Sequence, residues 1–275
     1  MPVAKILRLP LRLAVHACSG LVEPLRALAR HRSLFLLLLR RDLADRTSGT
    51  VLGFSWLLVQ PALQMLAFWF LLELVLQVRF PGRIGFLDYF LVGMLPWLLI
   101  SEAVMRSTAV LNDLSSLYSR MAFPIVLLPL LPLVMAGAIF GMVYIVLVGL
   151  LAGPLAALYA PLIIAALLLW LLPLAYLLSV VGLFVRDFRQ FLPFVLTMFM
   201  YLTPFLYMPQ MLPEAMQPFM VLNPLADILA VVHHLILGLP VTAGNWIRPW
   251  LLWLVLLGPA WVIFYRAQPH MREAL

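Results

Sequence analysis

Long apolar stretches, separated by short polar breaks, dominate the pattern of this chain. The first stretch covers residues 54–77, and the second covers residues 87–103. The break between them contains charged and turn-forming residues, namely Arg79, Pro81, Gly82 and Arg83. A helix crosses a bilayer with about 20 apolar residues, so these two stretches predict two membrane-spanning helices. The polar residues that follow, 106–120, predict a short helix in water.

Residues 121–185 carry no charged side chain, and this length allows two or three crossings. Arginines flank the segment on both sides: Arg120 before it, and Arg186 and Arg189 after it. Positive residues gather on the cytoplasmic side, so both flanks are expected there and the number of crossings is even. The pair Gly153-Pro154 divides the segment. The pattern therefore predicts two spans, at 122–152 and 155–185.

The last third predicts two further spans, at residues 190–207 and 249–265. The segment between them, 208–248, is apolar but repeatedly interrupted, by Pro209, Pro213, Pro218, Pro224, Gly238, Pro240 and Gly244. A single crossing there would place the C-terminal arginines outside. We therefore expect two short re-entrant helices that enter the outer leaflet and return. Asn223-Pro224 indicates the start of one such helix, and Gly238 indicates its end.

These elements predict an all-α integral membrane protein with six transmembrane helices. Residues 1–53 form a cytoplasmic N-terminal region with an interface helix, and residues 54–275 form the six-span domain. Of the 18 basic residues, this topology leaves only three outside: Arg79, Arg83 and Arg248. Such a bias is typical of a bacterial inner-membrane protein with its N- and C-termini in the cytoplasm.

The composition agrees with the bilayer as the main solvent. Hydrophobic residues make up 65% of the chain, charged residues make up 11%, and the mean hydropathy is +1.09. A soluble domain carries about 25% charged residues. The net charge of +7 does not indicate a nucleic-acid partner, because the basic residues gather ahead of the first span, where they favour contact with anionic membrane lipids.

Several kinds of chemistry lack their sequence signals. A phosphate-binding loop needs a lysine after its glycines, and the single lysine, Lys5, has no glycine before it. No His or Glu pattern suggests a metal site. The acids that are candidates for a catalytic cluster are scattered rather than paired: Asp42, Asp45, Asp113, Asp187, Glu214 and Asp227. We expect no enzymatic activity, no metal and no cofactor on this chain.

A segment at residues 33–46 is too short to span and fits a helix in the cytoplasmic interface. Its arginines Arg40, Arg41 and Arg46 are candidates for a gate at which anionic lipid head groups gather, and the alternative is a simple anchor. At the cytoplasmic end of the second span, Glu102 and Arg106 lie four residues apart, which predicts a local ion pair.

Aromatic and amide side chains in two spans suggest a sugar path, because sugars stack on aromatic faces and buried amides face protein or a channel. The candidates are Trp56, Gln60, Gln64, Phe68, Trp69, Tyr201, Phe205 and Tyr207. For the aromatic residues, the alternative is an interfacial belt and ordinary packing.

A series of short motifs runs in order from about residue 33 to the end of the chain. They are Leu39-Arg40-Arg41-Asp42, Ser48-Gly49-Thr50-Val51-Leu52-Gly53, Trp56 with Gln60-Pro61, Gly93-Met94-Leu95-Pro96-Trp97, Met121-Ala122-Phe123-Pro124, Val185-Arg186-Asp187-Phe188-Arg189-Gln190, Thr203-Pro204-Phe205-Leu206-Tyr207 and Leu222-Asn223-Pro224-Leu225. With these motifs on this topology, the chain resembles the permease subunits of ABC-2 type exporters, also called type V exporters, for O-antigen, capsule and teichoic-acid polymers.

The resemblance implies a homodimer with two copies of a separate cytoplasmic ABC ATPase, which would bind ATP and Mg. The substrate would be a lipid-linked polysaccharide, and periplasmic or outer-membrane export components would be further partners. The loop after the second span would dock onto the ATPase as a coupling helix, through Arg106, Asn112, Asp113, Tyr118 and Arg120. The departures from the family are an additional N-terminal segment, residues 1–32, and a less basic end to the coupling segment.

Other functions remain open at this point. A membrane enzyme that acts on lipid-linked sugars would use similar arginines and aromatics, but it needs a catalytic cluster of acids or histidines. An ABC-2 exporter of another lipid or of a drug would share the fold. A secondary transporter would show inverted repeats with interrupted helices in matching positions.

Overall fold

The computed structural model describes residues 21–49, 51–78, 80, 84–120 and 123–272, and the regular elements in these ranges are helical. Within this part of the chain, five helical segments are long and apolar enough to cross a membrane. They are Gly53–Val75, Phe86–Asp113, Ile125–Ala152, Pro154–Phe184 and Ala243–Ala267. Each coincides with a span predicted from the sequence, so the all-helical, multi-pass architecture is confirmed.

The sixth predicted span, 190–207, corresponds to α9, Arg186–Leu202, which has 17 residues. At 1.5 Å per residue this helix is about 25 Å long, which is the lower limit for a crossing. It ends because Thr203 adopts an extended backbone ahead of Pro204, and the residue before a proline disfavours the helical conformation. A total of six spans stays a prediction.

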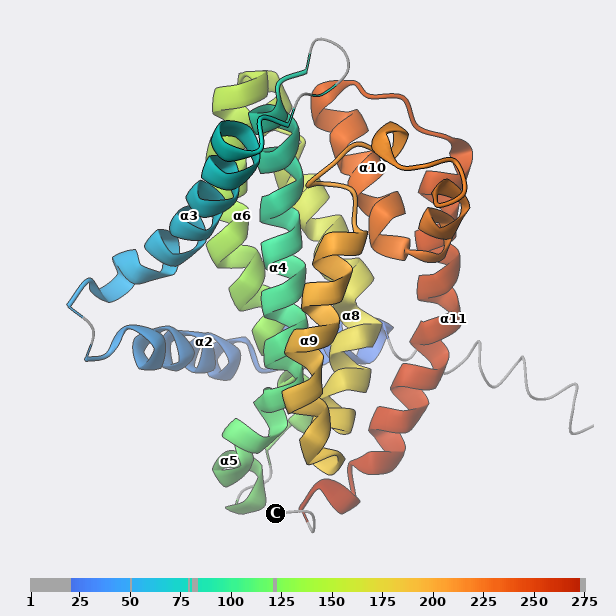
Figure 1. Cartoon of the computed structure of the whole chain (residues 1–275). Helices are drawn as coiled ribbons and strands as arrows, with labels where there is room; N and C mark the ends of the chain where they lie inside the picture. The colour runs from blue at the N-terminus through green and yellow to red at the C-terminus, as the bar shows by residue number, and fades with distance from the viewer. Residues whose placement is uncertain (1–20, 50, 79, 81–83, 121–122, 273–275) are drawn as a thin grey trace, which may run out of the picture.

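The centre of the bundle is α4, Phe86–Asp113, which packs between α6, Leu130–Ala152, and α8, Ala160–Phe184 (Figure 1). α4 is buried on nearly all sides: Phe90, Val92, Met94 and Leu99 have no exposed surface. A helix that is buried on every side needs apolar residues around its whole circumference.

The predicted end of the second span, at residue 103, is wrong as a helix boundary, because α4 continues to Asp113. The polar residues in this part do not disturb the helix. The hydroxyls of Ser107 and Thr108 donate to carbonyl oxygens of the preceding turn, both at 2.7 Å. The helix ends at Leu114, and a separate short helix, α5, covers Ser115–Arg120.

Close contact between α4 and α8 depends on Gly182. A Cβ atom at this position would lie 2.0 Å from the carbonyl oxygen of Thr108, so the α8 backbone touches the α4 backbone here. Asn112 adds a side-chain hydrogen bond, its amide donating to the Gly182 carbonyl at 3.2 Å. Small residues at helix crossings allow such approach in membranes, where close packing takes the place of the hydrophobic effect between helices.

A proline in α8 is compensated from α11, Ala243–Ala267. Pro173 has no N–H, which leaves the carbonyl of Leu169 without its usual helical donor. The indole N–H of Trp253 in α11 donates to this carbonyl at 2.7 Å. In return, the indole N–H of Trp170 in α8 donates to the Pro249 carbonyl at 3.0 Å. The two bonds hold α8 against α11. They also give the Leu169 carbonyl a hydrogen-bond donor, which the hydrocarbon of a bilayer cannot provide.

The first candidate span packs only loosely on the rest of the chain. It contains α3, Trp56–Trp69, and a π-helical continuation, Phe70–Val75, and Figure 1 shows α3 leaning away from the bundle. Pro61 is its one buried residue among those described. Large apolar side chains such as Leu63, Leu66 and Phe70 are exposed, so lipid or another chain must cover this helix.

Between residues 208 and 242 the structure has one α-helix where two short helices were predicted. This helix is α10, Pro224–Leu237, and two short 3₁₀ turns precede it. Its ends confirm the sequence prediction: the Asn223 side chain accepts from the Leu225 N–H, and Gly238 takes the left-handed conformation (φ 70°). With 14 residues, α10 is too short to cross.

The last span begins earlier than predicted, at Ala243 rather than at Pro249. The reason is a capping box between Thr242 and Asn245, in which the Thr242 N–H donates to the Asn245 side chain. This cap starts the helix six residues ahead of the proline.

Candidate functional site

Four charged side chains form a closed ring between the interface helix α2, Arg32–Thr47, and the central helix α4. Arg46 pairs with Asp42 on its own helix at 3.0 Å and with Glu102 of α4 at 2.9 Å. Arg106 of α4 pairs with Asp42 at 3.2 Å and with Glu102 at 3.6 Å. We call these four residues the charge ring. The local Glu102–Arg106 pair predicted from the sequence is confirmed.

The charge ring is partly shielded from solvent. The side chain of Arg46 is 12% exposed, whereas Glu102 and Arg106 are about one-third exposed. Two acids and two bases cancel in charge, which lowers the desolvation penalty that a single buried ion would carry. The ring is therefore a specific link between α2 and α4 rather than a pair of surface contacts.

A polar cavity of about 190 Å³ lies next to the charge ring. Its polar lining comes from Arg46, Gln60, Gln64, Ser101 and Glu102, and its apolar lining comes from Leu57, Pro61, Trp97, Leu98, Ile139 and Phe140. The cavity thus lies among the end of α2 and the helices α3, α4 and α6. One nitrogen of Arg46, Nη2, is buried without a hydrogen-bond partner in the part of the chain that the structure describes.

Gln60 and Gln64 are one helical turn apart on α3 and both are exposed, so the two amides line one side of the cavity. Hydrocarbon offers no hydrogen bonds, and polar groups that face it are costly. The structure therefore brings together three candidates that were predicted separately: the amides Gln60 and Gln64, and Arg46.

The candidate coupling residues are spread over three environments. Arg106 belongs to the charge ring, and Asn112 bonds the Gly182 carbonyl inside the bundle. Asp113 is exposed at the end of α4, near α5. Tyr118 and Arg120 lie on α5, but their side chains are outside the described part of the structure. Of the five, only Asp113 is seen to present its side chain to solvent near α5.

The three candidate head-group arginines also differ from one another. Arg40 and Arg41 are exposed on α2, and Arg41 makes a loose exposed pair with Asp45 at 3.6 Å. Arg46 turns inward to the charge ring instead. Arg40 and Arg41 therefore present their positive charges on the surface of α2, and Arg46 links α2 to α4.

The aromatic candidates do not share one surface within a single chain. Trp56 and Tyr201 are exposed, Phe68, Trp69 and Tyr207 are half-buried, and Phe205 is completely buried. Phe205 stacks on Trp97 with ring centroids 5.7 Å apart. Because Trp97 also lines the polar cavity, the motif that contains Phe205 supports the cavity wall from behind rather than lining it.

Sequence reasoning missed Asp42, Trp97, Ser101 and Glu102 as site residues. A signal for two of them is present: Asp42 and Arg46 on α2 repeat the acid–base spacing of Glu102 and Arg106 on α4. Two helices that carry matching i, i+4 pairs can exchange partners across their interface. Trp97 and Ser101 carry no such signal.

Two of the acids that a membrane enzyme could use, Asp42 and Asp227, lie in separate ion-paired clusters. Asp42 belongs to the charge ring, and Asp227 bonds Arg248 and Asn245. Over the described ranges, no three His, Cys, Asp or Glu side chains lie close enough together to hold a metal ion.

Comparison with known proteins identifies relatives of this chain. Residues 33–237 match the ABC-2 type transporter family. An O-antigen export system permease protein RfbA of Myxococcus xanthus is 27% identical over 192 residues, which is 68% of this chain and 73% of the relative. A protein of the same name from Klebsiella pneumoniae is 25% identical over 202 residues, 71% of this chain and 77% of the relative. The chain belongs to the ABC-2 type transporter family.

Proposed function

We propose that this chain is the transmembrane permease subunit of an ATP-driven ABC exporter that moves a lipid-linked polysaccharide across the bacterial inner membrane. The observation that carries the proposal is the polar cavity between the charge ring and the amides of α3, in a chain whose spans are otherwise apolar. The names of the relatives, O-antigen export permeases, support a polysaccharide as the cargo.

The exposed arginines of α2 and the polar cavity suit the two parts of such a substrate. Arg40 and Arg41 attract the phosphate groups of a lipid carrier at the membrane surface. Sugar hydroxyls then find donors and acceptors in Gln60, Gln64 and Ser101, with Trp97 as an apolar wall. The lipid chain remains in hydrocarbon beside the exposed apolar face of α3.

The fold also suggests how ATP hydrolysis elsewhere reaches this path. α5 is the proposed docking element for a partner ATPase, which binds the ATP and Mg. α4 is one helix from its start to Asp113, so a push on α5 is transmitted along it to Glu102 and Arg106. The charge ring passes this motion to α2, the proposed gate.

A homodimer explains the exposed amides of α3. Gln60 and Gln64 would face hydrocarbon in an isolated chain, which is costly. A second copy against this face would turn the half-open cavity into a closed polar path. α2, α5 and the end of α11 lie at the same end of the bundle (Figure 1), which supports a cytoplasmic position for both termini. Periplasmic and outer-membrane components would receive the polymer.

Co-expression with a candidate ABC ATPase tests the proposal directly. We expect the two proteins to copurify in a mild detergent, and a lipid-linked glycan to stimulate ATP hydrolysis by the complex several-fold. A diacyl lipid without the glycan is the control and should not stimulate. If the two chains do not copurify, or if both lipids stimulate equally, the proposal is contradicted. The membrane enzyme and the exporter of another lipid would then be the alternatives to test.

Substitution of both cavity amides, Gln60→Leu with Gln64→Leu, is expected to lower polymer export about tenfold or more. Each lost hydrogen bond to a sugar is worth about 0.5–1.5 kcal/mol, and 1.4 kcal/mol corresponds to a factor of ten. The measurement is surface polymer per amount of permease in the membrane. Gln60→Asn with Gln64→Asn keeps the amides and should retain most of the export. Full export by the leucine variant would mean that the cavity does not contact the cargo.

A further inference from the structure

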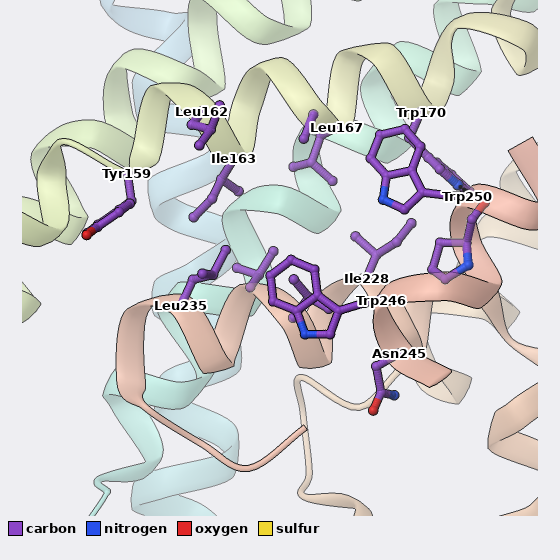
Figure 2. A pocket seen from close by; sticks show the side chains of 14 residues that line it. Tyr159, Leu162, Ile163, Leu167, Trp170, Ile228, Leu235, Asn245, Trp246 and Trp250 are labelled. Atoms are coloured by element: carbon purple, nitrogen blue, oxygen red, sulfur yellow. Dashed lines mark hydrogen bonds between the residues drawn. The ribbon is translucent and has the colours of Figure 1, made fainter. Parts of the chain in front are cut away.

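A second cavity lies at the opposite end of the bundle from α2 and is almost purely apolar. It has a volume of about 300 Å³ and lies between α8 on one side and α10 and α11 on the other. Figure 2 shows Leu162, Ile163 and Leu167 of α8 facing Ile228 and Leu235 of α10, with Trp246 of α11 beside them. The rim is open, because Leu162, Leu235 and Trp246 are exposed. We call this cavity the apolar groove.

The chemistry of its lining limits what can occupy the apolar groove. Water is unsuited, since it needs two to four polar partners and the lining offers few polar groups: the Asn245 amide, the Tyr159 hydroxyl and the tryptophan N–H groups. A hydrocarbon chain matches the apolar chemistry of this lining.

A fixed cation stands next to the apolar groove. Arg248 shares an acceptor with the lining residue Asn245: its Nε donates to the buried carboxylate of Asp227 at 2.8 Å. Nη2 of the same guanidinium also donates to Asp227 Oδ1, and the Asn245 amide donates to that same oxygen at 2.7 Å. A guanidinium has five N–H groups, so two bonds to Asp227 leave others unused on a side chain that is 36% exposed. These remaining N–H groups are available to phosphate oxygens.

From these observations we infer that the apolar groove is a phospholipid site, with one acyl chain between α8 and α10 and the lipid phosphate on Arg248. Under the topology proposed above, this site lies in the outer leaflet. The tryptophan rings on α11 suit this depth, because indoles favour the interface between hydrocarbon and head groups. The lipid would fill the space that α10, too short to span, leaves between α8 and α11.

Native mass spectrometry tests the inference on the chain alone, purified from membranes of phosphatidylethanolamine and phosphatidylglycerol. The wild type is expected to retain one phospholipid that Ala166→Trp loses, because Ala166 lines the groove. Its neighbour Ala165 is exposed on another face of α8, so Ala165→Trp is the matched control and should retain the lipid. Leu162→Trp, at the open rim, also blocks the groove and serves if Ala166→Trp does not fold.

The results of this experiment distinguish a phospholipid from other possible occupants of the apolar groove. A wild type without retained phospholipid, or equal retention by Leu162→Trp and Ala165→Trp, would overturn the inference. Dimer loss in Ala166→Trp with an unchanged lipid count would place a second copy in the groove instead. Dioleoylglycerol, which has the chains without the phosphate, should be retained less than dioleoylphosphatidylglycerol, and equal retention would refute the contact with Arg248. None of these measurements needs the ATPase or the polymer, so they stand apart from the transport proposal.

Discussion

Gly182→Ala is expected to destabilise the folded chain by about 3 kcal/mol, although alanine is usually the better helix residue by about 1 kcal/mol. The new Cβ would lie 2.0 Å from the Thr108 carbonyl oxygen and 2.7 Å from the Thr108 Cα, and both are backbone atoms that cannot rotate away. α4 and α8 must then separate, which also weakens the bond from Asn112 to the Gly182 carbonyl. The measurement is the apparent melting temperature in detergent, with an expected decrease of roughly 6–12 °C.

Gly149→Ala is the matched control, on α6. A Cβ there meets only the Ala157 Cβ, at an ordinary contact distance of 3.4 Å. Its melting temperature should equal or exceed that of the wild type, because only the gain in helix propensity remains. If the two variants melt alike, the close approach of α4 and α8 is not what holds this core together.

Features that depend on local sequence were predictable in this chain. The long apolar runs located five of the helices, because the bilayer thickness sets how many apolar residues a span needs. Asn223-Pro224 and Gly238 marked both ends of α10, since capping is decided within a few residues. The Glu102–Arg106 pair followed from one helical turn of spacing.

Features that depend on distant partners were not predictable. Asp42 and Arg106 are 64 residues apart in sequence, and nothing local indicates that they meet. The helix boundary expected at residue 103 failed for a related reason, because serine and threonine inside a helix bond to their own backbone and leave no polar break. The hydrogen bond from Trp253 to the Leu169 carbonyl likewise forms only once α8 and α11 are packed.

Reversal of one charge in the ring, Arg46→Glu, is expected to abolish most export. Asp42, Glu102 and the new carboxylate would then face the single cation Arg106, so the link between α2 and α4 becomes repulsive. Removing one partner of a buried ion pair costs about 3–5 kcal/mol, and the partial exposure of this ring reduces that to about 1–3 kcal/mol. The measurement is surface polymer per permease in the membrane, expected to fall at least about tenfold.

A second charge reversal tests whether Arg46 acts through its ion pair with Glu102, or whether export simply needs an arginine on α2. Arg46→Glu with Glu102→Arg restores opposite charges across the α2–α4 interface at the contact that measures 2.9 Å in the native ring. The double variant leaves two acids side by side on α2 and two bases side by side on α4, so export should recover only in part. Export should still be higher than the sum of the two single losses predicts. The exposed pair offers the control: Arg41→Glu breaks a loose 3.6 Å contact with Asp45 outside the ring, so any loss of export that it causes should not be rescued by Glu102→Arg. Because the ring is the one ionic contact between α2 and α4 found among the described residues, a double variant as inactive as Arg46→Glu would mean that α2 reaches its position by apolar packing alone.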